Sequence, residues 1–311
     1  MEATYLDGRA QRSAVAEAVL FERVIFCSLL FLIGLAAVPF GSIEPWWEGI
    51  FESAIFVLGA CCIATSINGS RWYVPSMLAP LIGLVVFAGL QTIPLWDTNV
   101  SSDLSSVANQ TISVDPFNTK RFVIKLLAVT LTLGMLFRYT LNRKDLLALA
   151  HLVIIVGAAS AAFAIWRRLL PDTALATLWN NKLQGESFGQ FMNRNHFAVL
   201  MEMSLGVALG LASYGGYGFK RYLYAALALL VCAALILANS RGGIISMLGQ
   251  FAFLSWIYSS WAFAGLSIEH TRGKHRSERP FWLSSRMLAL RCVLILLLFG
   301  VAFFGVLLLV G

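Results

Sequence analysis

Long apolar runs separated by short polar stretches dominate the chain from residue 24 onward. A membrane-spanning helix needs about 20 mostly apolar residues, and nine segments fit that description. They are Val24–Phe40, Ile50–Ser66, Tyr73–Leu95, Phe122–Phe137, Leu146–Trp166, His196–Ser213, Tyr222–Ala238, Gly243–Ala264 and Leu288–Val310. The pattern predicts an all-α fold, a polytopic membrane helix bundle of about nine transmembrane helices.

The first apolar run is too long for the core of a signal peptide, and more than twenty polar-rich residues precede it. We therefore interpret it as a retained helix. Composition agrees with a lipid environment, because 59% of the 311 residues are hydrophobic and 13% are charged. Soluble domains average about 45–50% apolar and about 25% charged residues. We treat residues 1–311 as a single transmembrane domain.

Basic residues predict the orientation of the bundle, because Lys and Arg gather in cytoplasmic loops. With a cytoplasmic N-terminus, fifteen of the 23 basic residues fall inside and eight outside. Residues 1–21 then form a cytoplasmic tail, 265–286 a basic cytoplasmic loop, and 96–119 and 167–195 loops on the outer side. The basic loop contains IEHTRGKHRSERP, which fits an anchor beside anionic lipid better than a nucleic-acid site.

Arg241 is one of the few outer cations, and it lies in the motif NSRGG between the seventh and eighth segments. A helix N-terminus offers free N–H groups and a positive dipole end to an anion. Gly242 lets an anion approach the backbone, Ser240 can cap or donate, and a guanidinium forks onto phosphate. The alternative is a tight turn with Arg241 reaching the lipid headgroups.

A polar cluster opens the sixth segment, in FGQFMNRNHFA. Asn193, Arg194, Asn195 and His196 can donate to phosphate and sugar hydroxyls, or can simply cap a helix at the membrane boundary. Glu202 follows six residues deeper, where an ionisable group is costly. We expect Glu202 to support the ligand-binding residues rather than to act as a base.

Four further outer cations are expected to complete an electropositive rim for an anionic, lipid-linked substrate. They are Arg121, Lys125, Arg167 and Arg168. Single members can instead contact only lipid phosphates. The five cysteines lie in apolar runs without metal-ligand spacing, and no Walker loop, HExxH or GxSxG motif is present. No metal and no cofactor is expected.

Five motifs in order resemble the O-antigen ligase and O-antigen polymerase superfamily. They are PFGSIEPWW after the first segment, QTIPLW, SVDPFNT, GQFMNRNHFA and NSRGG. The resemblance covers most of the chain and does not separate ligase from polymerase. It implies a fold like that of C-type membrane glycosyltransferases and a metal-independent transfer of glycan from a polyprenyl diphosphate carrier, such as undecaprenyl diphosphate. The acceptor would be a lipid or a glycan at the periplasmic face of a bacterial inner membrane.

The resemblance also implies roles for two motifs and marks one departure. Arg241 would match the diphosphate-stabilising arginine, and Asn193–His196 the polar opening. Family members carry a periplasmic loop after the ninth helix, with a further arginine and the histidine proposed as base, and this chain ends before that loop. We expect a fragment, a second polypeptide that supplies the loop, or a non-catalytic protein, and the general base is unknown. A small-anion, bicarbonate-like transporter and a non-catalytic subunit of a polysaccharide assembly system are the alternative functions.

Overall fold

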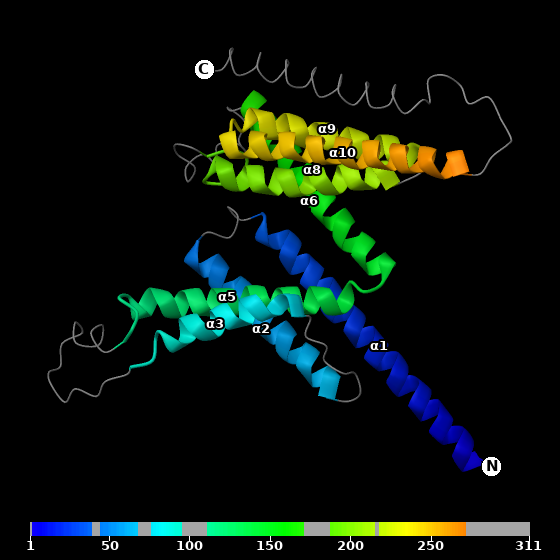
Figure 1. The fold of residues 1–311 in the computed structure, drawn as a ribbon. Coiled ribbons are helices and arrows are strands. Elements are labelled where there is room, and N and C mark those ends of the chain that lie inside the picture. The colour runs from blue at the N-terminus through cyan, green and yellow to red at the C-terminus, as the bar shows by residue number, and fades with distance from the viewer. Residues whose placement is uncertain are drawn as a thin grey trace.

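The computed structural model describes residues 2–38, 44–67, 76–94, 111–170, 187–214 and 218–271. These residues form helices and no β-strand, apart from an isolated bridge between Phe188 and Phe191. The helices are α1 (Glu2–Ala36), α2 (Pro45–Ile67), η2 (Ser76–Leu78), α3 (Ala79–Leu90), α5 (Pro116–Tyr139), α6 (Arg143–Leu169), α8 (Arg194–Tyr214), α9 (Phe219–Leu237) and α10 (Arg241–Thr271). The predicted all-α fold is confirmed for this part of the chain (Figure 1).

Six of the described helices are long and apolar enough to cross a membrane: α1 from Ala16 onward, α2, α5, α6, α8 and α9. The expected third span corresponds to a shorter apolar helix, Ser76–Leu90, and the eighth to the 31-residue helix α10. The ninth, Leu288–Val310, lies outside the described residues. The chain is a multi-pass helical membrane protein, while the total of nine spans and the direction of insertion stay predictions.

Successive helices run in alternating directions, so their ends fall into two groups. The starts of α2, α5, α8 and α10 lie toward the left of Figure 1, beside the last turns of α1, α3, α6 and α9. We call this the mouth end. Two hydrogen bonds tie segments together there: Ser113 N–H donates to the Gln91 carbonyl at 3.0 Å, and Gln190 Nε2 donates to the Ala37 carbonyl at 3.3 Å.

Ion pairs join helices at the opposite end. Arg23 of α1 contacts Asp145 of α6 at 2.5 Å, and Arg138 of α5 contacts Glu22 of α1 at 2.8 Å. The basic residues Arg138, Arg143 and Lys144, which the charge pattern predicts to be cytoplasmic, belong to this end. The positive-inside tendency therefore predicts that the mouth end faces away from the cytoplasm.

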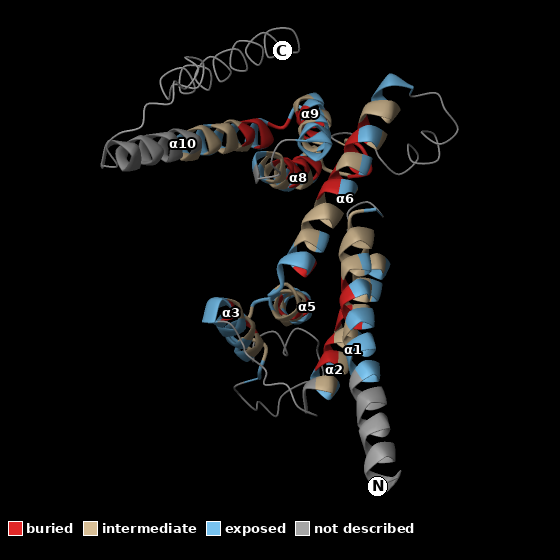
Figure 2. Cartoon of the chain, turned by 90° about the vertical axis from the view of Figure 1, so that its right-hand side faces the viewer, coloured by how far each residue is buried: buried red, intermediate tan, exposed pale blue. Residues whose placement is uncertain are grey.

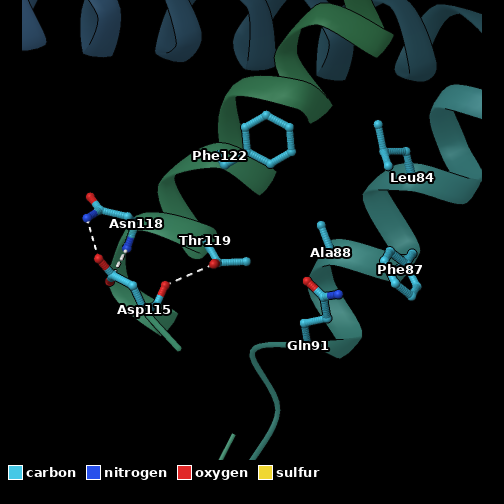
Figure 3. A pocket seen from close by; sticks show the side chains of 8 residues that line it. All are labelled: Leu84, Phe87, Ala88, Gln91, Asp115, Asn118, Thr119 and Phe122. Atoms are coloured by element: carbon cyan, nitrogen blue, oxygen red, sulfur yellow. Dashed lines mark hydrogen bonds between the residues drawn. The ribbon is translucent and has the colours of Figure 1, made fainter. Parts of the chain in front are cut away.

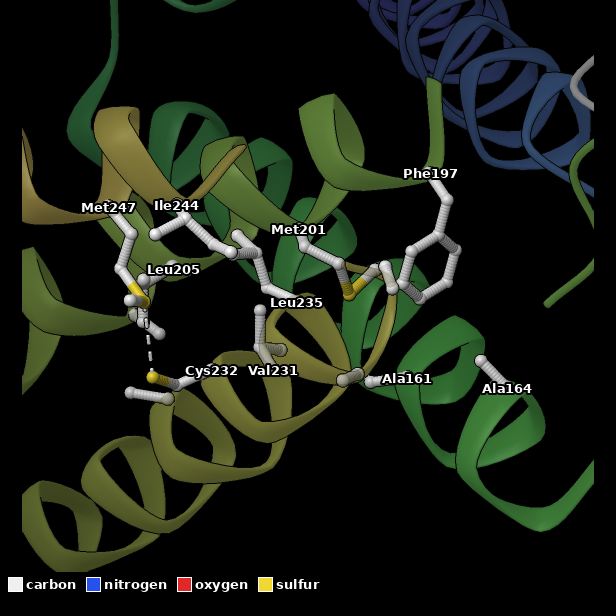
Figure 4. Packing of buried hydrophobic residues seen from close by; sticks show 14 of the residues in the cluster. Ala161, Ala164, Phe197, Met201, Leu205, Val231, Cys232, Leu235, Ile244 and Met247 are labelled. Atoms are coloured by element: carbon white, nitrogen blue, oxygen red, sulfur yellow. Dashed lines mark hydrogen bonds between the residues drawn. The ribbon is translucent and has the colours of Figure 1, made fainter. Parts of the chain in front are cut away.

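Two hydrophobic cores hold the helices together, and buried residues form separate stripes along them (Figure 2). One core joins α1, α2 and α5 through Leu29, Ile55 and Met135. The larger core joins α6, α8, α9 and α10, and many of its buried residues are alanines (Figure 4). Small side chains allow helix backbones to approach closely in lipid, where packing rather than water exclusion drives association.

Helices α6 and α8 of the larger core approach each other closely at Gly157. A Cβ added at Gly157 would overlap the Oγ and Cβ of Ser204. The Ser204 hydroxyl is held in place, because it donates to the carbonyls of Leu200 at 2.8 Å and Val153 at 3.2 Å. Glycine at position 157 is therefore required by space, and this contact sets the distance between the two helices.

We expect Gly157→Ala to destabilise the protein by about 1–3 kcal/mol, the usual cost of overpacking a core. Gly249→Ala is the matched control, because nothing lies within 4 Å of a Cβ at that position on α10. The midpoint temperature at which the detergent-solubilised protein loses its monodisperse gel-filtration peak measures the effect. Adding Ser204→Gly should recover part of the loss in Gly157→Ala; equal midpoints for the two glycine variants would contradict the contact.

Candidate functional site

A tight turn delivers the chain into α8. Phe188 and Phe191 exchange backbone hydrogen bonds of 3.1 Å, and Gly189 between them has φ +57°. A Cβ added at Gly189 would lie 3.0 Å from both the Ala164 Cβ and the Phe197 Cε2, so glycine is required by conformation and by space. The rings of Phe188 and Phe191 meet Phe197 edge-on, with centroids 5.0 and 6.1 Å away.

This turn places Asn193 directly before α8. Its Oδ1 accepts the backbone N–H of Asn195 at 2.8 Å, and its carbonyl accepts from His196 at 3.1 Å. Asn193 therefore caps the helix. Arg194 becomes the first residue of α8 and is partly buried, while Asn195 and His196 are exposed.

The start of α10 is built in a similar way. Asn239, after the end of α9, has φ +50°, which turns the chain into the next helix. Ser240 is 2% exposed and caps α10, because its Oγ accepts the Gly243 N–H at 3.3 Å. Its hydroxyl proton is directed to Asn195 Oδ1 at 2.8 Å. One serine thus caps α10 and ties it to the first turn of α8.

Glu202 lies beside this junction. A Cβ added at Gly243 would be 2.8 Å from the Ala198 Cβ and 3.3 Å from Glu202 Oε1, so the first turn of α10 packs against α8 at these residues. The positive end of the α10 dipole stabilises a carboxylate at that position. No hydrogen bond or ion pair of the Glu202 carboxylate is found within the described residues. Its backbone carbonyl accepts from Gln250 Nε2 at 3.0 Å.

The arginines predicted to bind an anion occupy defined places at this end. Arg194 and Arg241 are the first residues of α8 and α10, the two helices that the Ser240–Asn195 hydrogen bond joins. Arg241 and Gly242 are exposed. Arg167, in the last turn of α6, donates to the Gly189 carbonyl and so holds the turn before α8. Arg168 is exposed beside it. We call the junction of Asn193–His196 with Ser240–Gly243 the α8–α10 mouth.

Arg121 and Lys125 are not brought to the α8–α10 mouth. Both extend from α5 toward Glu48 of α2: the Arg121 Nη2 lies 3.9 Å from a Glu48 oxygen, and Lys125 Nζ pairs with the other oxygen. They belong to the bundle of α1, α2, α3 and α5, and Glu48 offsets part of their charge. The electropositive rim expected from the sequence is therefore divided between two bundles.

Two uncharged residues that shape the mouth, Gly189 and Gln190, are not among the site residues predicted from the sequence, and the motif FGQF is the only sequence signal for them. Gly243, which the NSRGG motif does mark, permits the close contact between α10 and α8. Gln190 is 6% exposed and donates to Ser160 Oγ at 2.6 Å. Its buried Oε1 has no hydrogen-bond partner in the described part of the chain. No group of three or more potential metal ligands is found among the described residues.

No protein-family model, curated protein or solved structure matches the chain. The geometry of the mouth and the sequence motifs are therefore the basis for the functional proposal.

The Ser240–Asn195 link should be measurable as a coupling between two substitutions. Loss of the helix cap in Ser240→Ala should by itself lower the free energy of unfolding by about 1 kcal/mol. Combined with Asn195→Ala, Ser240→Ala should show a coupling of about 0.5–1.5 kcal/mol, the net worth of one hydrogen bond. Ser213→Ala combined with Asn195→Ala is the control, because within the described residues the Ser213 hydroxyl donates to the Leu209 carbonyl of its own helix and to no other helix. Strict additivity of Ser240→Ala and Asn195→Ala would disprove the link.

Proposed function

We propose that the α8–α10 mouth binds the diphosphate of a polyprenyl-diphosphate-linked glycan, and that the protein takes part in glycan transfer or polymerisation at the periplasmic face of a bacterial inner membrane. The observation that carries this proposal is the joining of two helix N-termini by the Ser240–Asn195 hydrogen bond, with Arg194 and Arg241 as their first residues.

The chemistry of the mouth suits a diphosphate for two reasons. Two helix N-termini add their positive dipole ends and free N–H groups at one place. Arg241 adds a guanidinium that forks onto phosphate oxygens, and no hydrogen bond or ion pair occupies it in the described part of the chain. The exposed Gly242 leaves its backbone open to an anion.

In the proposed reaction, the bond between the anomeric carbon and the diphosphate oxygen breaks, and the acceptor hydroxyl oxygen bonds to that carbon. The electron pair of the broken bond leaves with the diphosphate, and a base takes the hydroxyl proton. Arg241 and the N–H groups stabilise the charge that grows on the diphosphate. The general base is left unassigned, and His196, exposed on the first turn of α8, is proposed only as a ligand-contacting residue.

The remaining charged residues have supporting roles in this proposal. Arg167 positions the turn before α8 through its bond to the Gly189 carbonyl. Glu202 balances the positive end of α10 and orients its first turn against α8. Arg168 contributes to the field around the mouth, whereas Arg121 and Lys125, engaged by Glu48, serve at most to attract an anionic substrate to the surface.

Arg241→Ala should weaken the binding of geranylgeranyl diphosphate to the purified full chain by about tenfold or more. A hydrogen bond to a charged group contributes about 1.5–3 kcal/mol, which corresponds to that range. Arg241→Lys keeps the positive charge but loses the paired N–H donors of the guanidinium. Its affinity for the diphosphate should therefore lie between those of the unmodified protein and Arg241→Ala. Titration of the detergent-solubilised protein with the diphosphate, followed by native mass spectrometry, gives the three affinities.

Arg121→Ala is the matched control, because it removes an arginine at the same end of the molecule but in the other bundle. It should change the affinity less than about twofold, as expected for an exposed charge in high dielectric. Equal losses in Arg121→Ala and Arg241→Ala would show that the diphosphate is attracted only by overall charge. Unchanged affinity in Arg241→Ala would reject the mouth as the site.

In cells of the source bacterium, Arg241→Ala should abolish the surface or secreted polysaccharide that depends on this protein. Solute uptake into vesicles that is insensitive to Arg241→Ala, with unchanged polysaccharide at normal expression, would support a small-anion transporter instead. Polysaccharide that is lost on deletion of the protein but retained in Arg241→Ala would support a non-catalytic subunit.

A further inference from the structure

A second feature of the mouth end lies in the other bundle, between the last turn of α3 and the first turns of α5. An open cleft of about 390 Å³ separates these helices. Its walls are Leu84, Phe87 and Ala88 of α3 and Phe122 of α5. At its end lie Gln91, Asp115, Asn118 and Thr119 (Figure 3). A cleft of this size is comparable to small-molecule sites.

The cleft changes from apolar to polar along the direction of the two helices. Leu84, Phe87 and Phe122 are 44%, 60% and 50% exposed, so the apolar part opens sideways to lipid. The polar part lies where α5 begins and α3 has ended, at the boundary of the apolar segments. A ligand with an apolar chain and a polar head matches this gradient, because lipid heads and chains divide at the same depth.

Two segments that are far apart in the sequence build the polar part. They are Gln91–Pro94 and Ser113–Thr119, and the Ser113 N–H donates to the Gln91 carbonyl at 3.0 Å. Both segments belong to motifs of the sequence, QTIPLW and SVDPFNT, that have no role in the α8–α10 mouth. In the structure the two motifs lie next to each other and together form the polar end of the cleft.

The polar groups favour a neutral, hydroxyl-bearing head. No partner of the Gln91 side-chain amide is found within the described residues, and an amide can both donate to and accept from a hydroxyl. The Thr119 hydroxyl, on the opposite side of the cleft (Figure 3), donates to the Asp115 carbonyl at 2.8 Å and lies 2.7 Å from Ser113 Oγ, so its oxygen can accept from a ligand hydroxyl.

Asp115 supplies the only charge among the lining residues. Its carboxylate accepts the backbone N–H of Asn118 at 3.0 Å and the Asn118 side-chain amide at 2.6 Å, which lowers its pKa. It is therefore ionised at neutral pH. Lys120 and Arg121 follow on α5 but do not line the cleft, so its lining offers one negative charge and no cation to pair with a phosphate.

We propose that the α3–α5 cleft binds a membrane lipid with an uncharged, hydroxyl-bearing headgroup, such as a glycosyl-diacylglycerol. The Gln91 amide and the Thr119 hydroxyl bind the headgroup of the lipid, and Leu84, Ala88 and Phe122 contact its acyl chain. This assignment does not rest on the function proposed for the α8–α10 mouth, since the cleft belongs to the other bundle and has no cation in its lining.

The experiment compares two lipids on the delipidated, detergent-solubilised full chain by native mass spectrometry. Monoglucosyl-diacylglycerol should bind at least about tenfold more tightly than phosphatidylglycerol, a difference of about 1.4 kcal/mol. Leu84→Trp fills the cleft and should weaken the glucosyl lipid about tenfold. Val86→Trp is the matched control, because Val86 is 55% exposed on the same helix and does not line the cleft.

Two further variants test binding of the lipid headgroup separately from binding of the acyl chain. Gln91→Leu should reduce the affinity for the glucosyl lipid about three- to tenfold, the worth of a neutral hydrogen bond. Asp115→Asn retains a capping residue for α5 and should raise the affinity for phosphatidylglycerol. Arg241→Ala should leave the glucosyl lipid unaffected.

Equal affinities for the two lipids in the unmodified protein, or equal effects of Leu84→Trp and Val86→Trp, would overturn the proposal. A loss of glucosyl-lipid binding in Arg241→Ala would also overturn it, because it would place that lipid in the mouth. Failure of diphosphate binding in the unmodified protein bears only on the function proposed for the mouth.

Discussion

The hydrogen bond from Ser240 to Asn195 joins the two helix N-termini on which the α8–α10 mouth depends. Within a membrane, polar groups at helix ends must find partners in the protein or at the boundary. Ser240 meets this requirement twice, since it accepts an N–H of its own helix and donates to the neighbouring one. As a result, two positive helix ends that would repel each other are held at one place, where an anion can neutralise both.

Close packing below the mouth maintains this arrangement. Gly157 brings α6 against α8, and Gly243 brings α10 against α8, so three helices meet with little side-chain volume between them. Glu202 lies at the second contact and offsets part of the positive end of α10. The bundle of α1, α2, α3 and α5 has its own core and its own cleft. The two sites at the same end therefore differ in chemistry, because arginines lie at the α8–α10 mouth and the lining of the α3–α5 cleft contains no cation.

Much of the fold could be predicted from the sequence, because apolar length and helix caps are local signals. Asp115 before Pro116, Asn193 before Arg194 and Ser240 before Arg241 mark helix starts that the structure shows. Alternation of the spans also predicts that Arg194 and Arg241 lie at one end, and the structure places the starts of α8 and α10 together.

Contacts between helices could not be predicted in the same way, because they depend on how each helix is rotated and tilted about its neighbours. Spacing along α5 shows that Arg121 and Lys125 share a face, but not that this face meets Glu48 of α2. The sequence also does not predict that Ser240 bonds to Asn195 or that Glu202 lies beside Gly243, because both contacts join two helices. The cleft between α3 and α5 also required the structure, since its two motifs are separated in the sequence.

A cryo-electron microscopy map of the full chain with bound geranylgeranyl diphosphate would show where the diphosphate binds. We expect density for the diphosphate at the first turns of α8 and α10, in contact with the Arg241 guanidinium and the backbone N–H groups beside Gly242. Diphosphate density elsewhere on the protein, with the α8–α10 mouth empty at a saturating concentration of the ligand, would contradict this expectation.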